Sequence, residues 1–264
     1  MEPIRIIETV DEGIAMTGKF GFFQKIVPFI LIIGYMTGEI FVQNMAYLEL
    51  IPAYECKDSM SDNWARCYPT EFCHEDGSFS NDKVRVNSED PHSLNNWVDQ
   101  LNLTCVEHSS IGLLGTMLFL GWMTSSIMVP RLSDIYGRKK FFLGFHVMQV
   151  LAILAMLYTT SISSAFVILF MLGFSGVGRS PIVYIYIMEM LTPAQQKVAG
   201  PIFASSVAAC LAFGTIMLQF VSKDTSNLLW VSIGISIIIM IVTALMIPES
   251  PKFLHAQGRF EECR

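Results

Sequence analysis

Charged residues are scarce in this sequence, and their scarcity excludes most soluble folds. Only 15% of the 264 residues are charged and 52% are hydrophobic, whereas about 25% of the residues in a soluble domain are charged. The hydrophobic residues are gathered into long runs, and a run of about 20 such residues can cross the hydrocarbon core of a membrane. We therefore expect an integral membrane protein in contact with the lipid bilayer.

The sequence also lacks the patterns that enzymes and nucleic-acid-binding proteins carry. It contains no nucleophile next to a base, no phosphate-binding loop and no cluster of metal ligands. The formal net charge of −6 provides no basic surface for nucleic acid. We expect no enzymatic activity, no cofactor, no metal site and no nucleic-acid partner.

Six hydrophobic runs divide the chain, and none of them alternates as a strand would. A chain that crosses a lipid bilayer must pair its own backbone groups, and a helix does this within a single segment. The sequence therefore predicts an all-α membrane protein that forms a six-helix bundle. The predicted spans are residues 23–47, 109–130, 141–160, 163–189, 198–221 and 228–247.

Three longer polar regions lie outside these runs, in addition to the short loops between spans. Residues 1–22 are polar and amphipathic and show no signal-peptide pattern, so we expect the first span to act as its own insertion signal. Residues 48–108 form one large polar loop, and residues 248–264 form a polar tail.

The basic residues predict which way the bundle faces. The short loop predicted at residues 131–140 carries Arg131, Arg138, Lys139 and Lys140, and short basic loops remain on the cytoplasmic side. With six spans, both termini are then cytoplasmic and the large polar loop is external. The plasma membrane is the expected location.

Four of the six cysteines fall in the large polar loop. Cys56, Cys67, Cys73 and Cys105 predict two disulfides with three possible pairings, because their spacing does not match a zinc site. Disulfides persist in oxidising compartments, which agrees with an external loop. The sequence Asn102-Leu-Thr104 is a glycosylation sequon on the same loop.

Residues 130–140 resemble the signature loop of the major facilitator superfamily, Gly-x-Leu-x-Asp-Arg-x-Gly-Arg-Lys. Pro130 stands in place of the usual first glycine, and Ile135 in place of a usual basic residue. The positions that match are Leu132, Asp134, Gly137, Arg138 and Lys139.

Other segments resemble the organic cation, anion and carnitine transporter family. Residues 248–254, Pro-Glu-Ser-Pro-Lys-Phe-Leu, are similar to the motif that follows helix six in sugar porters and organic ion transporters. Residues 52–56 and 101–105 resemble the two ends of the long external loop of organic ion transporters, whereas sugar porters have a short one. Residues 11–12 and 18–24 also resemble that family's amino terminus. Complete members have twelve helices, so the resemblance covers an amino-terminal half.

The resemblance implies a charge cluster on the cytoplasmic face that gates the carrier. Ion pairs of this kind can bias an equilibrium between two conformations, although basic residues could also simply anchor a loop at the lipid headgroups. We expect gating for Asp134 and Arg138, because anchoring needs no acid, and anchoring for Lys139 and Lys140. The implied cluster is Asp134, Gly137, Arg138, Glu189, Lys197, Glu249 and Lys252, where Lys252 replaces an arginine and loses bidentate pairing.

Ionisable residues inside the predicted spans are few, and such residues are functional candidates. His146 is expected to pack, whereas Glu39 and Arg179 are expected to face a substrate cavity. At 1.5 Å per helical residue, Glu39 and Arg179 lie about 10 Å apart along the membrane normal, too far for a direct pair. The other cavity candidates are Gln43, Asn44, Tyr184 and Tyr186. Glu39 could alternatively lie at the outer headgroups.

These observations predict a transporter of small organic ions, whether cation, anion or zwitterion, that works by alternating access. Substrate sites of such carriers lie between two halves. The chain is thus a fragment, a half that pairs with a second six-helix half or a larger membrane complex, or a protein that no longer transports. One alternative is a non-transporting membrane subunit derived from a transporter, and another is a carrier similar to sugar porters.

Overall fold

The computed structural model describes residues 22–57, 63–74 and 83–259. The predicted amphipathic amino terminus up to residue 21 and the end of the tail, residues 260–264, lie outside the described residues. The elements follow in the order α2 (Phe22–Gln43), α3 (Met45–Leu48), β1 (Tyr54–Lys57), β2 (Trp64–Cys67), α4 (Pro69–Phe72), β3 (Val84–Val86), α5 (Trp97–Gln100), α6 (His108–Tyr136), α7 (Arg138–Tyr158), α8 (Ile162–Arg179), α9 (Pro181–Met190), α10 (Pro193–Ile216), the π-helix η1 (Met217–Val221), α11 (Thr225–Met246) and α12 (Pro251–Ala256).

The predicted all-α bundle of six membrane-spanning helices is confirmed. Six helical segments in the described part of the chain are long and apolar enough to cross a membrane. They are Lys25–Gln43, His108–Tyr136, Arg138–Tyr158, Ile162–Met190, Pro193–Val221 and Thr225–Met246.

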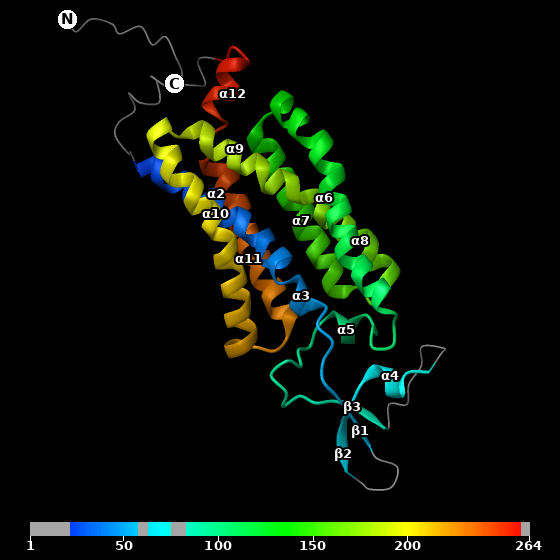
Figure 1. The fold of residues 1–264 in the computed structure, drawn as a ribbon. Coiled ribbons are helices and arrows are strands. Elements are labelled where there is room, and N and C mark those ends of the chain that lie inside the picture. Colours follow the sequence, from blue (N-terminus) through cyan, green and yellow to red (C-terminus); the bar gives the residue numbers. More distant parts are fainter. Residues whose placement is uncertain (1–21, 58–62, 75–82, 260–264) are drawn as a thin grey trace, which may run out of the picture.

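The spanning helices form two groups of three (Figure 1). Helices α6, α7 and α8 pack together in one group, and α10 and α11 pack on α2 in the other. Helix α7 joins the groups by packing on α11, and α9 contacts both α2 and α7. Helix α12 lies at one end of the bundle, and the polar residues 48–107, here called the disulfide segment, lie at the other (Figure 1).

The loop predicted at residues 131–140 is almost entirely helical, which corrects the sequence interpretation. Helix α6 continues through Pro130 to Tyr136, and α7 begins at Arg138. Proline is tolerated inside a membrane helix, where neighbouring groups can satisfy the backbone that it frees. The turn is therefore Gly137 alone, whose φ of 109° favours glycine over any residue with a side chain.

The fourth span is divided, although the sequence predicted one continuous helix. Helix α8 ends at Arg179, Ser180 has φ −99° and ψ −80°, and Pro181 begins α9. Proline cannot donate a backbone hydrogen bond but is well suited to the first position of a helix. The break therefore places Arg179 at a helix end inside the membrane span.

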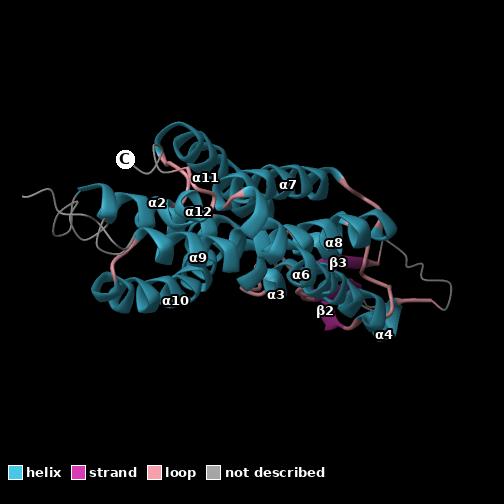
Figure 2. Ribbon diagram, turned by 90° about the horizontal axis from the view of Figure 1, so that it is seen from above, coloured by secondary structure: helices cyan, strands magenta, loops and turns pink. Residues whose placement is uncertain are grey.

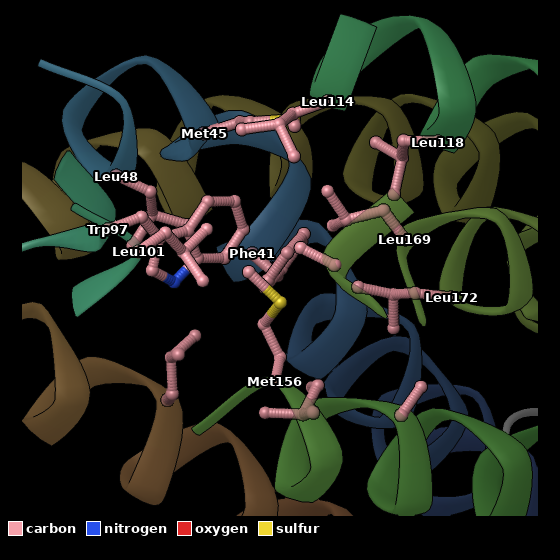
Figure 3. Close-up of a cluster of buried hydrophobic side chains, with 14 of the residues drawn as sticks. Phe41, Met45, Leu48, Trp97, Leu101, Leu114, Leu118, Met156, Leu169 and Leu172 are labelled. Atoms are coloured by element: carbon pink, nitrogen blue, oxygen red, sulfur yellow. The ribbon is translucent and has the colours of Figure 1, made fainter. Parts of the chain in front are cut away.

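Helices α6 and α8 approach each other at two glycines. A Cβ built on Gly173 would overlap the carbonyl oxygen of Leu118, and one built on Gly121 would overlap that of Phe170. Small residues let membrane helices come this close, which increases their van der Waals contact. The main apolar cluster lies beside this contact and extends to α5 through Trp97 (Figure 3).

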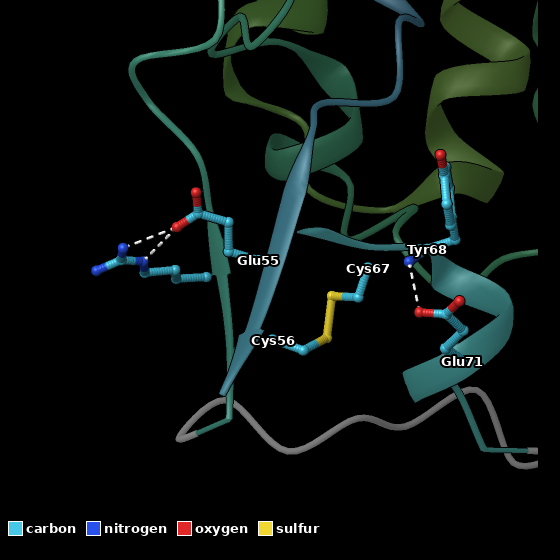
Figure 4. The surroundings of a disulfide bond; sticks show 6 residues. Glu55, Cys56, Cys67, Tyr68 and Glu71 are labelled. Atoms are coloured by element: carbon cyan, nitrogen blue, oxygen red, sulfur yellow. Dashed lines mark hydrogen bonds and ion pairs between the residues drawn. A yellow bond between two sulfur atoms is a disulfide. The ribbon is translucent and has the colours of Figure 1, made fainter. Parts of the chain in front are cut away.

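The disulfide segment contains three short strands that the sequence interpretation missed (Figure 2). They form an antiparallel sheet in the order β2-β1-β3. The two predicted disulfides are confirmed, and the pairing that was open is Cys56–Cys67, which joins β1 to β2 (Figure 4), and Cys73–Cys105.

Two amide side chains hold the disulfide segment against the bundle. Asn96 donates to the carbonyl of Tyr47, which lies in α3, at 2.9 Å. Gln100 donates to the carbonyl of Thr159 at 2.8 Å, just beyond the end of α7. The segment is therefore tied to the ends of two spanning regions.

Candidate functional site

Arg138 is the centre of the charge cluster at the α12 end of the bundle. Its guanidinium is paired with Asp134 on α6 and, at 3.0 Å, with Glu189 on α9. It also donates to the hydroxyl of Ser133 at 3.1 Å. Arg138 is buried, so these acceptors replace water around a charge that would be costly to bury alone.

The segment after α11 completes the cluster. Glu189 accepts a hydrogen bond from the Ser250 hydroxyl at 2.5 Å, and Ser250 caps α12 by accepting from the backbone of Phe253 at 3.3 Å. Glu249 accepts from the backbone nitrogens of Lys139, at 3.0 Å, and of Ser250, at 3.1 Å. The cluster therefore joins α6, α7, α9 and α12.

Gly137 is needed for this arrangement for a second reason. A Cβ at this position would overlap the carboxylate of Glu249. The sequence interpretation did not single out Ser133 or Ser250. A serine directly before a proline is a common start for a helix, so residues 250–251 carried a signal for the cap.

In the described residues the ion pairs of this cluster join Arg138 to Asp134 and Glu189, and neither pair involves Lys197 or Lys252. Lys197 is exposed on α10, and within the described residues it makes no ion pair with Glu189, whose partner is Arg138. Lys252 lies in the first turn of α12, whereas the groups that hold Glu249 are backbone nitrogens.

The Arg179 side chain reaches α2 at the residue before Glu39. Arg179 lays its guanidinium against Gly38 of α2, where a Cβ would overlap Nη1, and it interacts electrostatically with Glu39. The structure places no ion pair between them in its described residues, and Glu39 instead accepts from Gln43 at 3.0 Å.

The other cavity candidates are not brought together. Asn44 is buried against Gly214 and donates to the carbonyls of Ile40 and Cys210, at 2.8 and 3.2 Å. Tyr186 is buried and donates to the carbonyl of Pro248, near the charge cluster. These two side chains connect helices within the bundle.

The remaining candidates differ in the fraction of each residue that is exposed. Tyr184 is 40% exposed, whereas Glu39 and Arg179 are only 3% and 1% exposed, so Tyr184 lies at the surface of the bundle and this pair lies inside it. His146 is also buried, with its ring nitrogens 3.1 Å from the carbonyl oxygens of Phe142 and Gly34. It lies in the contact between α7 and α2.

Comparison with known proteins places the bundle in a family. A family model described as "Sugar (and other) transporter" matches residues 63–264. This chain belongs to that family of transporters. The resemblance to the major facilitator superfamily and its organic ion transporters is confirmed, and the described residues of this sugar (and other) transporter family member form a six-helix bundle.

Three relatives illustrate the similarity of this family member. It is 26% identical to an organic cation transporter-like protein of Drosophila melanogaster, over 94% of this chain and 48% of that protein. It is 28% identical to a putative metabolite transport protein of Bacillus subtilis, over 62% and 36%. It is 25% identical to the human organic cation/carnitine transporter 2, over 64% and 30%. The chain thus spans about half, or less, of the length of these relatives.

Proposed function

We propose that this chain is one half of a carrier that moves small organic ions across the membrane by alternating access. Membership of a transporter family supports this, and so do relatives named for organic cation transport. Carriers of this kind place their substrate between two six-helix halves. A second six-helix half, on the same chain or another, completes the carrier.

The observation that carries the proposal is the charge cluster around Arg138. It ties the α6–α7 turn to α9 and to the segment after α11 through Glu189 and Ser250. A set of partly buried ion pairs stabilises one arrangement of helices over another when it exists in only one of them. The cluster acts as a latch that holds one conformation of the carrier and releases when the other forms.

The proposed orientation follows from the two ends of the bundle. The end with Arg138 and Lys140 is cytoplasmic, because short basic connections remain inside. The disulfide segment is external, since disulfides persist in oxidising compartments, and the carrier resides in the plasma membrane. Asn102, which is exposed in the disulfide segment, carries the N-linked glycan.

Uptake by proteoliposomes tests this function. The protein purified from its native membrane is reconstituted and offered radiolabelled tetraethylammonium, benzoate, glycine betaine and D-glucose. We expect saturable uptake of at least one organic ion and none of glucose. Preferred uptake of glucose would instead identify a carrier similar to sugar porters.

A second candidate function, a membrane subunit with a structural role, is favoured by the burial of Asn44, Arg179 and Tyr186 within the six helices. These side chains lie in the interior of the six helices. This alternative predicts that the reconstituted protein takes up none of the probes. It also predicts that the chain, when isolated from its native membrane, is part of a larger complex.

A further inference from the structure

Residues 88–100 of the disulfide segment, here called the strap, contact both groups of spanning helices. The strap lies at the end of the bundle opposite α12 (Figure 1). It is hydrogen-bonded to the end of α7, to the region around α3 and to the turn before α11. Helix α7 belongs to the group of α6, α7 and α8, whereas α3 follows α2 and α11 packs on α2. The strap therefore connects helix ends that belong to different groups.

Gln100 of the strap caps the end of α7. The last carbonyl groups of a helix have no partner within the helix, and the Gln100 amide donates to those of Met156 and Leu157, at 2.8 and 3.3 Å. It also donates to the carbonyl of Thr159 at 2.8 Å. One amide group thus serves three carbonyls at the end of a helix of the first group.

Asn96 attaches the strap to the region that follows α2. Its amide donates to the carbonyl oxygens of Tyr47 and Leu50, at 2.9 and 2.7 Å. The oxygen of the same side chain accepts from the backbone nitrogen of Val98 at 3.0 Å and so caps α5. Asn96 therefore orders the strap and also attaches it to the second group.

The turn before α11 gives the strap another attachment to the second group. Asn95 donates to the carbonyl of Lys223 and accepts from the backbone nitrogen of Thr225, each at 3.0 Å. The Lys223 ammonium donates to the carbonyls of Ser88 and Asp90, at 2.8 and 2.9 Å. The strap is thus bonded to the regions that adjoin both α2 and α11.

Trp97 anchors the strap in the main apolar cluster. It is only 1% exposed, and its ring centroid lies 5.5 Å from that of Phe41 on α2 (Figure 3). The same cluster contains Leu114 of α6 and Leu229 of α11, so both groups contribute side chains to it. Burial of a large aromatic side chain stabilises the position of the strap through the hydrophobic effect.

We infer that the strap holds the two groups of three helices in one fixed arrangement at this end of the bundle. Packed helices can slide past one another by about 1–2 Å. Hydrogen bonds from one segment to helix ends in both groups oppose such a movement, because sliding would separate the carbonyls from their donors. The inference concerns the six helices themselves and goes beyond the proposed function, since the strap has this mechanical role whether or not the protein transports.

Distances between spin labels test the role of the strap. One pair of labels joins the groups, at Tyr158→Cys on α7 and Phe220→Cys on η1, and a second pair lies within one group, at Tyr158→Cys and Leu113→Cys on α6. All three positions are exposed. The chain carries Cys263→Ser, because this cysteine lies outside the two disulfides, whereas Cys210 is buried. Double electron–electron resonance in lipid nanodiscs gives the distances.

Gln100→Glu removes the donors but keeps the shape of the side chain. At about pH 8 the glutamate is ionised, so it presents only oxygen atoms to the carbonyls of α7. We expect the distance between the groups to gain a population that is longer by about 2 Å or more, and the distance within one group to stay unchanged. Gln100→Lys still donates and should keep the natural distances. Asn63→Asp, an exposed change in the same segment, is the matched control and should keep them too.

A second variant releases the other side of the strap. Asn96→Asp combined with Lys223→Met keeps the oxygen that caps α5 but removes the side-chain donors that attach the strap to the second group. It should lengthen the distance between the groups in the same way. An unchanged distance between the groups in Gln100→Glu would overturn the inference. Equal changes in both pairs of labels would also overturn it, because they would show a general loosening of the helices.

Discussion

A single guanidinium, that of Arg138, contacts acceptors on two helices. Asp134 and Ser133 come from α6, and Glu189 comes from α9. Arginine has five N–H donors in a fixed plane, whereas lysine has a single ammonium group that cannot spread over the same acceptors. The residue type therefore follows from the geometry of the contacts.

Replacing Arg138 by alanine should destabilise the fold. Of its two partners in the described residues, Glu189, which is largely buried, would keep Ser250, and we expect a loss of about 2–3 kcal/mol in the free energy of unfolding. Lys140→Ala, at an exposed position two residues away, should change it by less than about 0.5 kcal/mol. Denaturant unfolding in lipid measures both, and equal effects would show that the cluster contributes no stability.

Glu49, just beyond α3, should make stability depend on pH. Burial raises its pKa from 4.5 to about 7, and its Oε1 atom has no hydrogen-bond partner among the residues that the structure describes. The folded state therefore holds this proton more strongly than the unfolded state, so stability falls as pH rises from 4.5 to about 7.

Glu49→Gln should remove that loss. The variant is expected to be more stable than the natural protein at pH 8 by on the order of 2 kcal/mol, and nearly equal to it at pH 4.5. Thermal unfolding at both pH values measures the change, with Glu107→Gln, at an exposed position, as a control. A difference that stays constant between the two pH values would contradict this account.

At the scale of helices, the contact between α6 and α8 depends on residues without side chains. Gly173→Ala would force its Cβ into the backbone of Leu118, and crowding of this kind costs about 1–3 kcal/mol. Gly144→Ala on α7 meets no atom within 4 Å and should be neutral or slightly stabilising, because alanine favours helix more than glycine does. Unfolding free energies test the pair, and similar values for both variants would mean that α6 and α8 are not in close contact.

The helices also show what the sequence could predict. Length and hydropathy were enough for six spans, because the lipid core requires apolar helices of a set length. The same rule predicted that α6 ends at Pro130 and that α8 and α9 form one helix. Both predictions differ from the structure, because hydropathy does not indicate whether a proline is tolerated inside a helix or begins a new one. The three strands were missed because each has only three or four residues.

For the whole molecule, contacts could be predicted from the sequence where the two residues are near each other in the chain or joined by a disulfide. Asp134 and Arg138 are four residues apart, so their pairing on adjoining helices was foreseeable. The contact of Arg179 with Gly38 was not, because it depends on a helix break and on how α2 packs against α8. The packing of distant segments also explains why Asn44 and Tyr186, which were predicted to line a cavity, instead connect helices within the bundle.

The two ends of the molecule have opposite character. At one end, disulfides and amide hydrogen bonds fix the disulfide segment to the bundle. At the other, ion pairs and a serine hydroxyl join α6, α7, α9 and α12. Covalent links do not open during a transport cycle, whereas ion pairs can. In the proposed carrier, conformational change is therefore expected at the end that contains Arg138.

Uptake of organic ions by the reconstituted native protein, compared with its Glu189→Gln variant, tests the central claim most directly. We predict saturable uptake of at least one of tetraethylammonium, benzoate and glycine betaine. Glu189→Gln should lower the rate of uptake by about tenfold through the lost pair with Arg138, while Lys140→Gln should not change it. Absence of uptake for all three ions, or equal rates for the natural protein and Glu189→Gln, would contradict the account.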